Sequence, residues 1–161
     1  MSVDKAVLDQ VYNAQNHEEL LEAYKDWAGD YDQNLVQDFG YVGYRLCAQL
    51  FDQHMQGKTS QSILDAGCGT GLVGEVLHSM GYVYLEGLDY SREMLDEAGK
   101  KGVYIRRIQA DLTLPLDIPD NSFDAIICVG TFTYGHVTSE AFSEFIRITK
   151  PGGIICFTIM E

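Results

Sequence analysis

The chain has 161 residues, of which 46% are hydrophobic and 22% charged, so it can form a globular domain with a buried core and is not a disordered segment. Its 11 Lys and Arg stand against 24 Asp and Glu, a formal net charge of -13, which disfavours a nucleic-acid or anionic-membrane surface because the phosphates would be repelled. No apolar run is long enough to span a membrane, and the first residues lack the apolar core of a signal peptide.

The four cysteines indicate a reduced compartment. They form no CxxC pair, and no histidine lies at metal-ligand spacing from them, so no metal site is predicted. Cys128 and Cys156 lie in apolar runs and are predicted to be buried thiols. We therefore expect an intracellular protein, in the cytoplasm, with a nuclear location left open.

The first 58 residues are predicted to be helical, because apolar residues recur there at helical spacing. The expected helices are Val3 to Asn13, a second one that starts at Asn16 or His17 and runs through Trp27, and Val42 to Met55. The predicted apolar face of the last helix consists of Leu46, Leu50 and Phe51, with Ala48 and Tyr44 nearby.

Strands and helices alternate over the rest of the chain. The expected strands are Ser62 to Ala66, Tyr82 to Leu88, Tyr104 to Ala110, Phe123 to Val129 and Ile154 to Met160. The expected helices are Leu72 to Ser79, Arg92 to Gly99 with Ser91 as its cap, and Ser139 to Thr149. Leu112 to Asn121 is predicted to be a loop, and Pro151-Gly152-Gly153 a turn.

Repeated β-α-β units predict a parallel sheet with helices on both faces, an α/β, Rossmann-like doubly wound fold. We divide the chain into an N-terminal helical lid or cap at 1–58 and a core at 59–161, within one domain overall.

The stretch from Ile63 to Gly74 is the centre of the predicted site. An apolar run ends in Asp65, glycines follow at positions 67, 69 and 71, and a helix begins at once. Glycines permit a tight turn and leave no Cβ in the way of a ligand, and a helix start favours an anionic ligand group. The spacing is ambiguous, because Gly69, Gly71 and Gly74 also give the dinucleotide fingerprint G-x-G-x-x-G. A glycine turn without any ligand is a further alternative.

Two acids follow at the ends of the next strands, where ligands of such sheets bind. Asp89 can accept from both hydroxyls of an adenosine ribose, and Asp111 from an adenine amino group, while the backbone N–H after Asp111 can donate to the same ring. Taken alone, Asp89 is equally compatible with a helix cap and Asp111 with a loop start. Two acids at successive strand ends after a glycine turn form a correlated pattern that these alternatives do not predict.

These motifs resemble the class I S-adenosylmethionine-dependent methyltransferases. The resemblance covers the chain from about Ile63 to its last residue and is carried by Asp65-x-Gly67-x-Gly69-x-Gly71, Asp89, Ala110-Asp111-Leu112, Phe123-Asp124 and Lys150-Pro151-Gly152-Gly153. Tyr24 to Asp32 also resembles the lid segment of small-molecule-type members, and Gly135-His136-Val137 is similar to one methyltransferase-like subgroup. The resemblance implies a methyltransferase that takes S-adenosylmethionine as cofactor, releases S-adenosylhomocysteine and methylates a small molecule.

The resemblance also implies a role for each site residue. The methionine and ribose part of the cofactor would be lined by Gly67, Cys68, Gly69 and Gly71, with Asp65 holding this loop and the cofactor amino group. The ribose and adenine would be bound by Asp89, Tyr90, Asp111 and Leu112. Val129 and Gly130 would lie under the methionine portion. Tyr24 and Tyr31 would cover the cofactor from the lid, although packing between helices explains these two aromatics equally well.

Methyl transfer from a sulfonium needs alignment of the acceptor and exclusion of water more than acid–base groups, so no catalytic residue is assigned firmly. Tyr134 and His136 are the candidates on the acceptor side, and a positioning role for His136 is preferred to proton abstraction. The sulfonium also suits an acidic pocket with aromatic edges, whereas a dinucleotide would bring two phosphate charges to an acidic chain.

A full class I sheet carries two more strands, which form a C-terminal hairpin beside the fifth strand. The sequence ends at Glu161, directly after the predicted fifth strand, so we expect a truncated form that binds cofactor with little turnover. The apolar Ile154-Ile155-Cys156-Phe157 would then be an exposed edge that permits self-association.

Two alternative functions stay open. A non-catalytic S-adenosylmethionine-binding or regulatory protein is favoured by the missing hairpin. An NAD(P)-dependent oxidoreductase is supported by the glycine fingerprint with Asp89, and opposed by Asp111-Leu112 and Pro151-Gly152-Gly153. The sequence names neither the methyl acceptor nor the oligomeric state.

Overall fold

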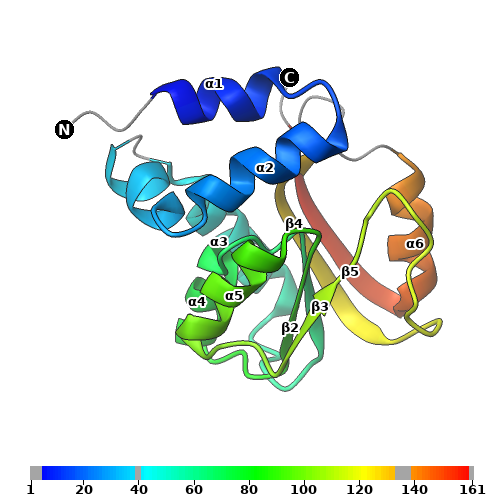
Figure 1. Ribbon diagram of the computed structural model, residues 1–161. Coiled ribbons are helices and arrows are strands. Elements are labelled where there is room, and N and C mark those ends of the chain that lie inside the picture. Colours follow the sequence, from blue (N-terminus) through cyan, green and yellow to red (C-terminus); the bar gives the residue numbers. More distant parts are fainter. Residues whose placement is uncertain (1–4, 39–40, 133–138, 160–161) are drawn as a thin grey trace.

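The computed structural model describes residues 5–38, 41–132 and 139–159 (Figure 1). In chain order its elements are α1 (Lys5–Asn13), α2 (His17–Trp27), the π-helix η1 (Gln33–Asp38), α3 (Gly43–Met55), β1 (Ile63–Ala66), α4 (Leu72–Ser79), β2 (Leu85–Asp89), α5 (Arg92–Lys101), β3 (Arg106–Gln109), β4 (Phe123–Phe132), α6 (Glu140–Ile148) and β5 (Thr149–Ile159). Within these residues no helix is both long and apolar enough to cross a lipid bilayer.

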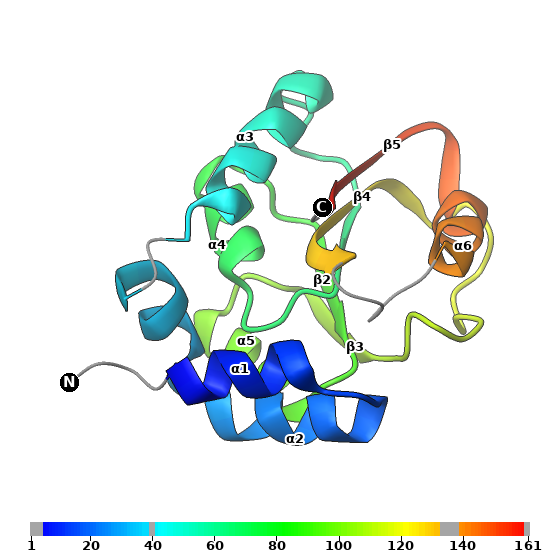
Figure 2. The ribbon, with the colours of Figure 1, turned by 90° about the horizontal axis from the view of Figure 1, so that it is seen from above.

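The predicted α/β fold is confirmed. The sheet has the strand order β3-β2-β1-β4-β5, and every neighbouring pair is parallel. The chain winds outward from β1 in one direction to β3 and then in the other to β5, so the order reverses between β1 and β4. Helices α3, α4 and α5 lie on one side of the sheet and α6 on the other (Figures 1 and 2).

The central strand β1 is buried along its whole length, as the parallel topology requires. Because successive side chains point to opposite faces, Ile63 packs in the core under α3 and α4, and Leu64 packs in the core under α6. A third, smaller core joins α1 and α2 through Val11, Leu20, Ala23 and Trp27. The division into a cap at 1–58 and a core at 59–161 stays a prediction.

Helix α3 buries part of the apolar side predicted for it, Phe51 with Ala48 and Tyr44, and exposes the two leucines. Leu46 and Leu50 are 60% and 49% exposed, whereas Phe51 is buried as expected. The buried face is Tyr44, Cys47, Ala48, Phe51 and Met55. These positions follow the spacing of three, four and seven residues that defines one side of a helix, and Leu46 falls on the opposite side.

Strands β2 and β3 are shorter than predicted, because a tyrosine at the start of each expected strand packs elsewhere. Tyr82 leaves the ladder, and its hydroxyl donates to Asp52 on α3 at 2.7 Å. Tyr104 precedes β3 and turns its hydroxyl to Asp65 at 2.5 Å. The predicted strands beginning at Tyr82 and Tyr104 therefore begin at Leu85 and Arg106.

Pro151-Gly152-Gly153 is part of a strand and not a turn between elements. Strand β5 begins at Thr149, which pairs with Phe123, and the next paired residue is Ile154, opposite Ala125. The residues between them bulge out of the ladder, with Gly152 at φ 80°. A Cβ at Gly153 would lie 2.6 Å from the backbone oxygen of Asp124, so glycine permits the close approach of β5 to β4.

Strand β5 is at one edge of the described sheet. Phe157 and Ile159 are 41% and 66% exposed. Cys128 on β4 is buried, as predicted, but Cys156 on β5 is only half-buried. Its Sγ lies 3.6 Å from the Sγ of Cys47 on α3, a contact that the spacing of the cysteines did not indicate.

Candidate functional site

A cavity of about 440 Å³ lies between the N-terminal helices and the carboxyl ends of the strands. Most of the predicted cofactor residues line it. These are Tyr24, Tyr31, Asp65, Gly67, Cys68, Gly69, Asp89, Tyr90, Asp111, Leu112, Val129 and Gly130. Gly71 does not line the cavity and instead is the N-cap residue of α4. The acceptor-side candidates Tyr134 and His136 lie outside the described residues.

The glycine turn, Gly67 to Gly71, connects β1 to α4. All three of its glycines have left-handed backbone, with φ of 66° at Gly67, 54° at Gly69 and 90° at Gly71, and L side chains strain such backbone. A Cβ at Gly67 would lie 2.2 Å from Oγ1 of Thr131, whereas a Cβ at Gly69 would meet nothing within 4 Å. The turn therefore packs tightly against β4 at Gly67 and has free space beside it at Gly69.

Gly74, the alternative third glycine of the fingerprint, lies within α4 and serves packing. A Cβ there would lie 2.4 Å from the Tyr104 hydroxyl oxygen. Because Gly74 has no Cβ, the Tyr104 ring can pass under α4, and its hydroxyl reaches Asp65. This fit does not distinguish between the two glycine patterns, because close packing of helix and strand is also a role of glycine in the dinucleotide motif.

Asp65 is the most deeply buried acid of the site, with 1% of its surface exposed. The pKa of its carboxyl is raised to about 7, because burial and the charge of Asp89 together outweigh the hydrogen bonds from Tyr104 and Gly74, which lower it. Asp65 lies at the end of β1, directly before the glycine turn. Its proton therefore comes on or off near neutral pH.

Asp89 ties the end of β2 to the glycine turn. One carboxylate oxygen accepts from the backbone N–H of Gly69 at 2.9 Å, and the other accepts from the N–H of Ser91 at 2.9 Å. Burial raises the pKa of Asp89, and these hydrogen bonds lower it. Each oxygen retains lone pairs for a further donor. Ser91 caps α5 as predicted, accepting from the N–H of Met94 at 3.2 Å.

Asp111 uses one carboxylate oxygen for its own loop and presents the other to the N-terminal helices. Its Oδ1 accepts from the N–H and the hydroxyl of Thr113 at 2.8 and 2.6 Å. Its Oδ2 lies 3.6 Å from Nε2 of His17, the first residue of α2. Leu112 follows with 8% of its surface exposed and packs in the core under α6.

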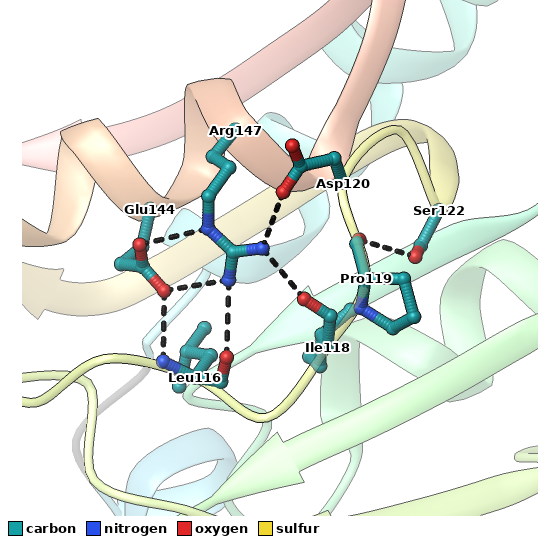
Figure 3. Close-up of polar contacts among 7 residues, drawn as sticks. All are labelled: Leu116, Ile118, Pro119, Asp120, Ser122, Glu144 and Arg147. Carbon is teal, nitrogen blue, oxygen red and sulfur yellow. Dashed lines mark hydrogen bonds and ion pairs between the residues drawn. The ribbon is translucent and has the colours of Figure 1, made fainter.

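The loop after β3 is held from behind by Arg147 on α6 (Figure 3). The guanidinium donates to the backbone oxygens of Leu116 and Ile118 at 3.0 and 2.7 Å and to the carboxylate of Asp120 at 2.8 Å. Glu144 accepts from the same guanidinium and from the N–H of Leu116 at 2.7 Å. The hydrogen bond from Arg147 lowers the pKa of Glu144 to about 2. The second half of the predicted loop is thus fixed to α6, beyond the residues that line the cavity.

Tyr24 and Tyr31 lie between the cavity and the N-terminal helices, and their covering of a cofactor stays a prediction. Each lines the cavity, and each also packs against the small core of α1 and α2. The Trp27 ring packs beside both of them, 4.7 Å from the Tyr31 ring and 6.4 Å from the Tyr24 ring. The indole N–H of Trp27 donates to Asn34 at 2.7 Å, which connects α2 to η1.

The structure adds a polar connection between the N-terminal segment and the glycine turn. Asp32 accepts from the hydroxyl of Thr70 and from Nζ of Lys101 at the end of α5. Lys101 also donates to the backbone oxygen of Thr70 at 2.7 Å. Asp32 belongs to the segment that resembled a lid, but no sequence feature had indicated Lys101 or Thr70 as its partners.

His17 is the clearest residue that the sequence reasoning missed. It lines the cavity, and its ring lies 4.3 Å from that of Tyr90. In the sequence it is an isolated histidine at a helix start, with nothing to connect it to two strand ends. Among the residues that the structure describes, no three His, Cys, Asp or Glu side chains gather as metal ligands would.

The model of the methyltransferase domain family matches residues 64–157. Human methyltransferase-like protein 27 is 40% identical over 140 residues, which cover 86% of this chain and 56% of that protein. The malonyl-[acyl-carrier protein] O-methyltransferase of Yersinia pestis is 33% identical over 143 residues, covering 88% of this chain and 50% of the relative.

Among solved structures, DhpI in its complex with SAH is similar with a TM-score of 0.63 and 26% identity, covering 85% of this chain and 65% of that one. The chain spans about half the length of the curated relatives that it matches.

Proposed function

The chain belongs to the methyltransferase domain family, whose model matches more than half of it, and from this we propose that its cavity binds S-adenosylmethionine for methyl transfer to a small molecule. The observation that carries the proposal is the convergence of the glycine turn, Asp89 and Asp111 on one cavity at the strand ends. The SAH complex of the structural relative DhpI supports the choice of cofactor.

The donor set of the cavity suits each part of this cofactor. The glycine turn and the start of α4 favour the carboxylate of its methionine part. The free lone pairs of Asp89 suit the ribose hydroxyls, and Asp111 with the backbone after it suits the adenine edge. The aromatic edges of Tyr24 and Tyr31 and the acids of the site suit the sulfonium. Gly71 would contribute through the helix start and not through contact.

S-adenosylmethionine supplies a methyl group on a positive sulfur that leaves as a neutral thioether. The residues of this chain would therefore orient the acceptor and exclude water, which together can lower a barrier by several kcal/mol. The N-terminal helices close the cavity above the strand ends, and Tyr41, Tyr44 and Thr131 line its side next to β4. We assign no general base among the described residues.

The acceptor is proposed to be a small, neutral or cationic molecule. The net charge of -13 disfavours nucleic acid, and the cavity is of a size typical for small ligands. The chain spans about half the length of its curated relatives. We therefore propose its activity and its acceptor from its own residues and do not transfer them from a relative.

Calorimetric titration of the folded chain with S-adenosylmethionine and S-adenosylhomocysteine, with NADH as the control ligand, tests this proposal. We expect saturable binding of both adenosyl ligands and none of NADH. Asp89→Ala should abolish it, and Asp111→Asn should weaken it while leaving the turn bonded to Asp89. NADH binding in their place would support an oxidoreductase. Cofactor binding without transfer to any acceptor would support a regulatory protein.

A further inference from the structure

His17 reaches from the N-terminal helices to the same two residues that are proposed to hold the adenine. Its ring centroid lies 4.3 Å from that of Tyr90, with the planes tilted by 52°. Its Nε2 lies 3.6 Å from Oδ2 of Asp111. Tyr90 follows β2 and Asp111 follows β3, so one residue of α2 bridges two neighbouring strand ends across the cavity.

The Nε2 atom of His17 lacks a hydrogen-bond partner within the described residues, although it is shielded from solvent. The side chain as a whole is 38% exposed, so the ring turns its outer edge to water and its Nε2 inward. A separation of 3.6 Å from the carboxylate is too long for a hydrogen bond. A buried polar atom without a partner is unfavourable, and His17 lines a cavity whose ligand could supply the partner.

We propose that His17 is an adenine-recognition residue, which donates its Nε2–H to a ring nitrogen of the bound base. This inference rests on the proposed function. Adenine carries its N6 donor beside its N7 acceptor. Oδ2 of Asp111 is an acceptor that its own loop leaves unused, and the backbone N–H of Leu112 is the proposed donor to the other side of the ring. N7, the ring acceptor beside the N6 amino group that Asp111 would hold, is then the acceptor within reach of His17.

This assignment gives α2 a role in binding. The helix begins at His17, where the Asn16 side chain caps it by accepting from the N–H of Glu19 at 2.9 Å. The segment between α2 and η1 is joined to the glycine turn through the bonds of Asp32 with Thr70 and Lys101. A ligand that bonds to His17 thereby connects the strand ends to α2 at the adenine side of the cavity.

The test combines a change in the protein with a change in the ligand. Binding of S-adenosylhomocysteine and of its 7-deaza analogue, in which N7 is a carbon, is measured by calorimetry for the wild type, His17→Leu and His17→Gln. In the wild type we expect the 7-deaza analogue to bind about fivefold to tenfold more weakly, as the loss of one hydrogen bond predicts. His17→Leu should bind both ligands equally, at the weaker level, and His17→Gln should recover part of the preference through its amide N–H.

His78→Gln is the matched control, because this histidine is exposed on α4 away from the cavity, and it should leave both affinities unchanged. Urea unfolding distinguishes a role of His17 in ligand binding from a role in the stability of the fold. Without ligand, His17→Leu should be as stable as the wild type, since it removes an unpaired nitrogen. An unchanged preference for the natural ligand in His17→Leu would overturn the role of His17. Absence of any binding by folded wild type would instead overturn the proposed function.

Discussion

Tyr104→Phe is the change that most directly tests how the buried acid beneath the glycine turn is held. The substitution removes only the hydroxyl that donates to Asp65 at 2.5 Å, while the ring keeps its place against Gly71 and Gly74. Asp65 is 1% exposed, so water cannot replace the lost donor. The loss should therefore appear as a lower free energy of unfolding.

The size of the loss should depend on pH, because the pKa of Asp65 is raised to about 7 by burial. A carboxyl with a raised pKa favours the folded state most when protonated, and that contribution is lost as the pH rises through about 7. A hydrogen bond to a neutral group contributes about 0.5–1.5 kcal/mol and one to a charged group about 1.5–3 kcal/mol. Tyr104→Phe should thus lose the smaller amount in acid and the larger amount in alkali.

Urea unfolding of the wild type and Tyr104→Phe at about pH 5.5 and about pH 8.5, on either side of the raised pKa, measures the difference. Tyr82→Phe is the matched control, since it deletes a hydroxyl that donates at 2.7 Å to the half-buried Asp52, outside the cavity. The reasoning is refuted if the loss in Tyr104→Phe is the same at the two pH values, because Asp65 would then not ionise between them in the folded chain.

Three further outcomes are expected. Leu46→Gln should change the unfolding free energy by less than about 0.5 kcal/mol and Phe51→Ala should lower it by about 3–5 kcal/mol in urea unfolding; similar values would mean that α3 has the other face inward. Gly69→Ala should lose about 1–2 kcal/mol through backbone strain, and Gly67→Ala more, because its Cβ would lie 2.2 Å from a threonine oxygen; equal thermal stabilities would contradict this. Glu144, with its pKa lowered to about 2, stabilises the fold above its ordinary pKa and loses this effect as the pH falls, so Glu144→Gln should flatten the acid transition followed by circular dichroism; an unaltered transition would rule this out.

The parts of the fold that could be predicted are those that local chemistry determines. Helix α4 has the bounds Leu72–Ser79 that its pattern indicated, because a glycine turn precedes it and nothing competes for its residues. The cap at Ser91 followed from its hydroxyl, which accepts from the N–H group three positions later, and the start of α2 fell at His17, one of the two predicted residues. Alternating strands and helices then left few topologies other than a parallel sheet.

The errors arose where a side chain has a choice between partners far apart in sequence. Tyr82 and Tyr104 read as strand residues, yet each leaves its ladder for a carboxylate, on Asp52 and Asp65. The apolar residues of α3 permit two faces, and only the sheet selects the one with Phe51. The same holds for the site. Asp89 and Asp111 could be predicted because they follow strands, but His17 could not, because the sequence does not show where α2 packs against the sheet.

Two buried acids with raised pKa values, Asp65 and Asp89, make the cavity favour a cationic ligand over an anionic one. Asp65 and Asp89 both have raised pKa values, first through burial, and the charge of Asp89 raises the pKa of Asp65 further. A positive group bound near them would offset this repulsion and lower both pKa values, so its binding should release protons near neutral pH. Two phosphates would raise them again. Proton release or uptake, measured from the buffer dependence of the binding enthalpy, therefore distinguishes a sulfonium cofactor from a dinucleotide without any assay of turnover.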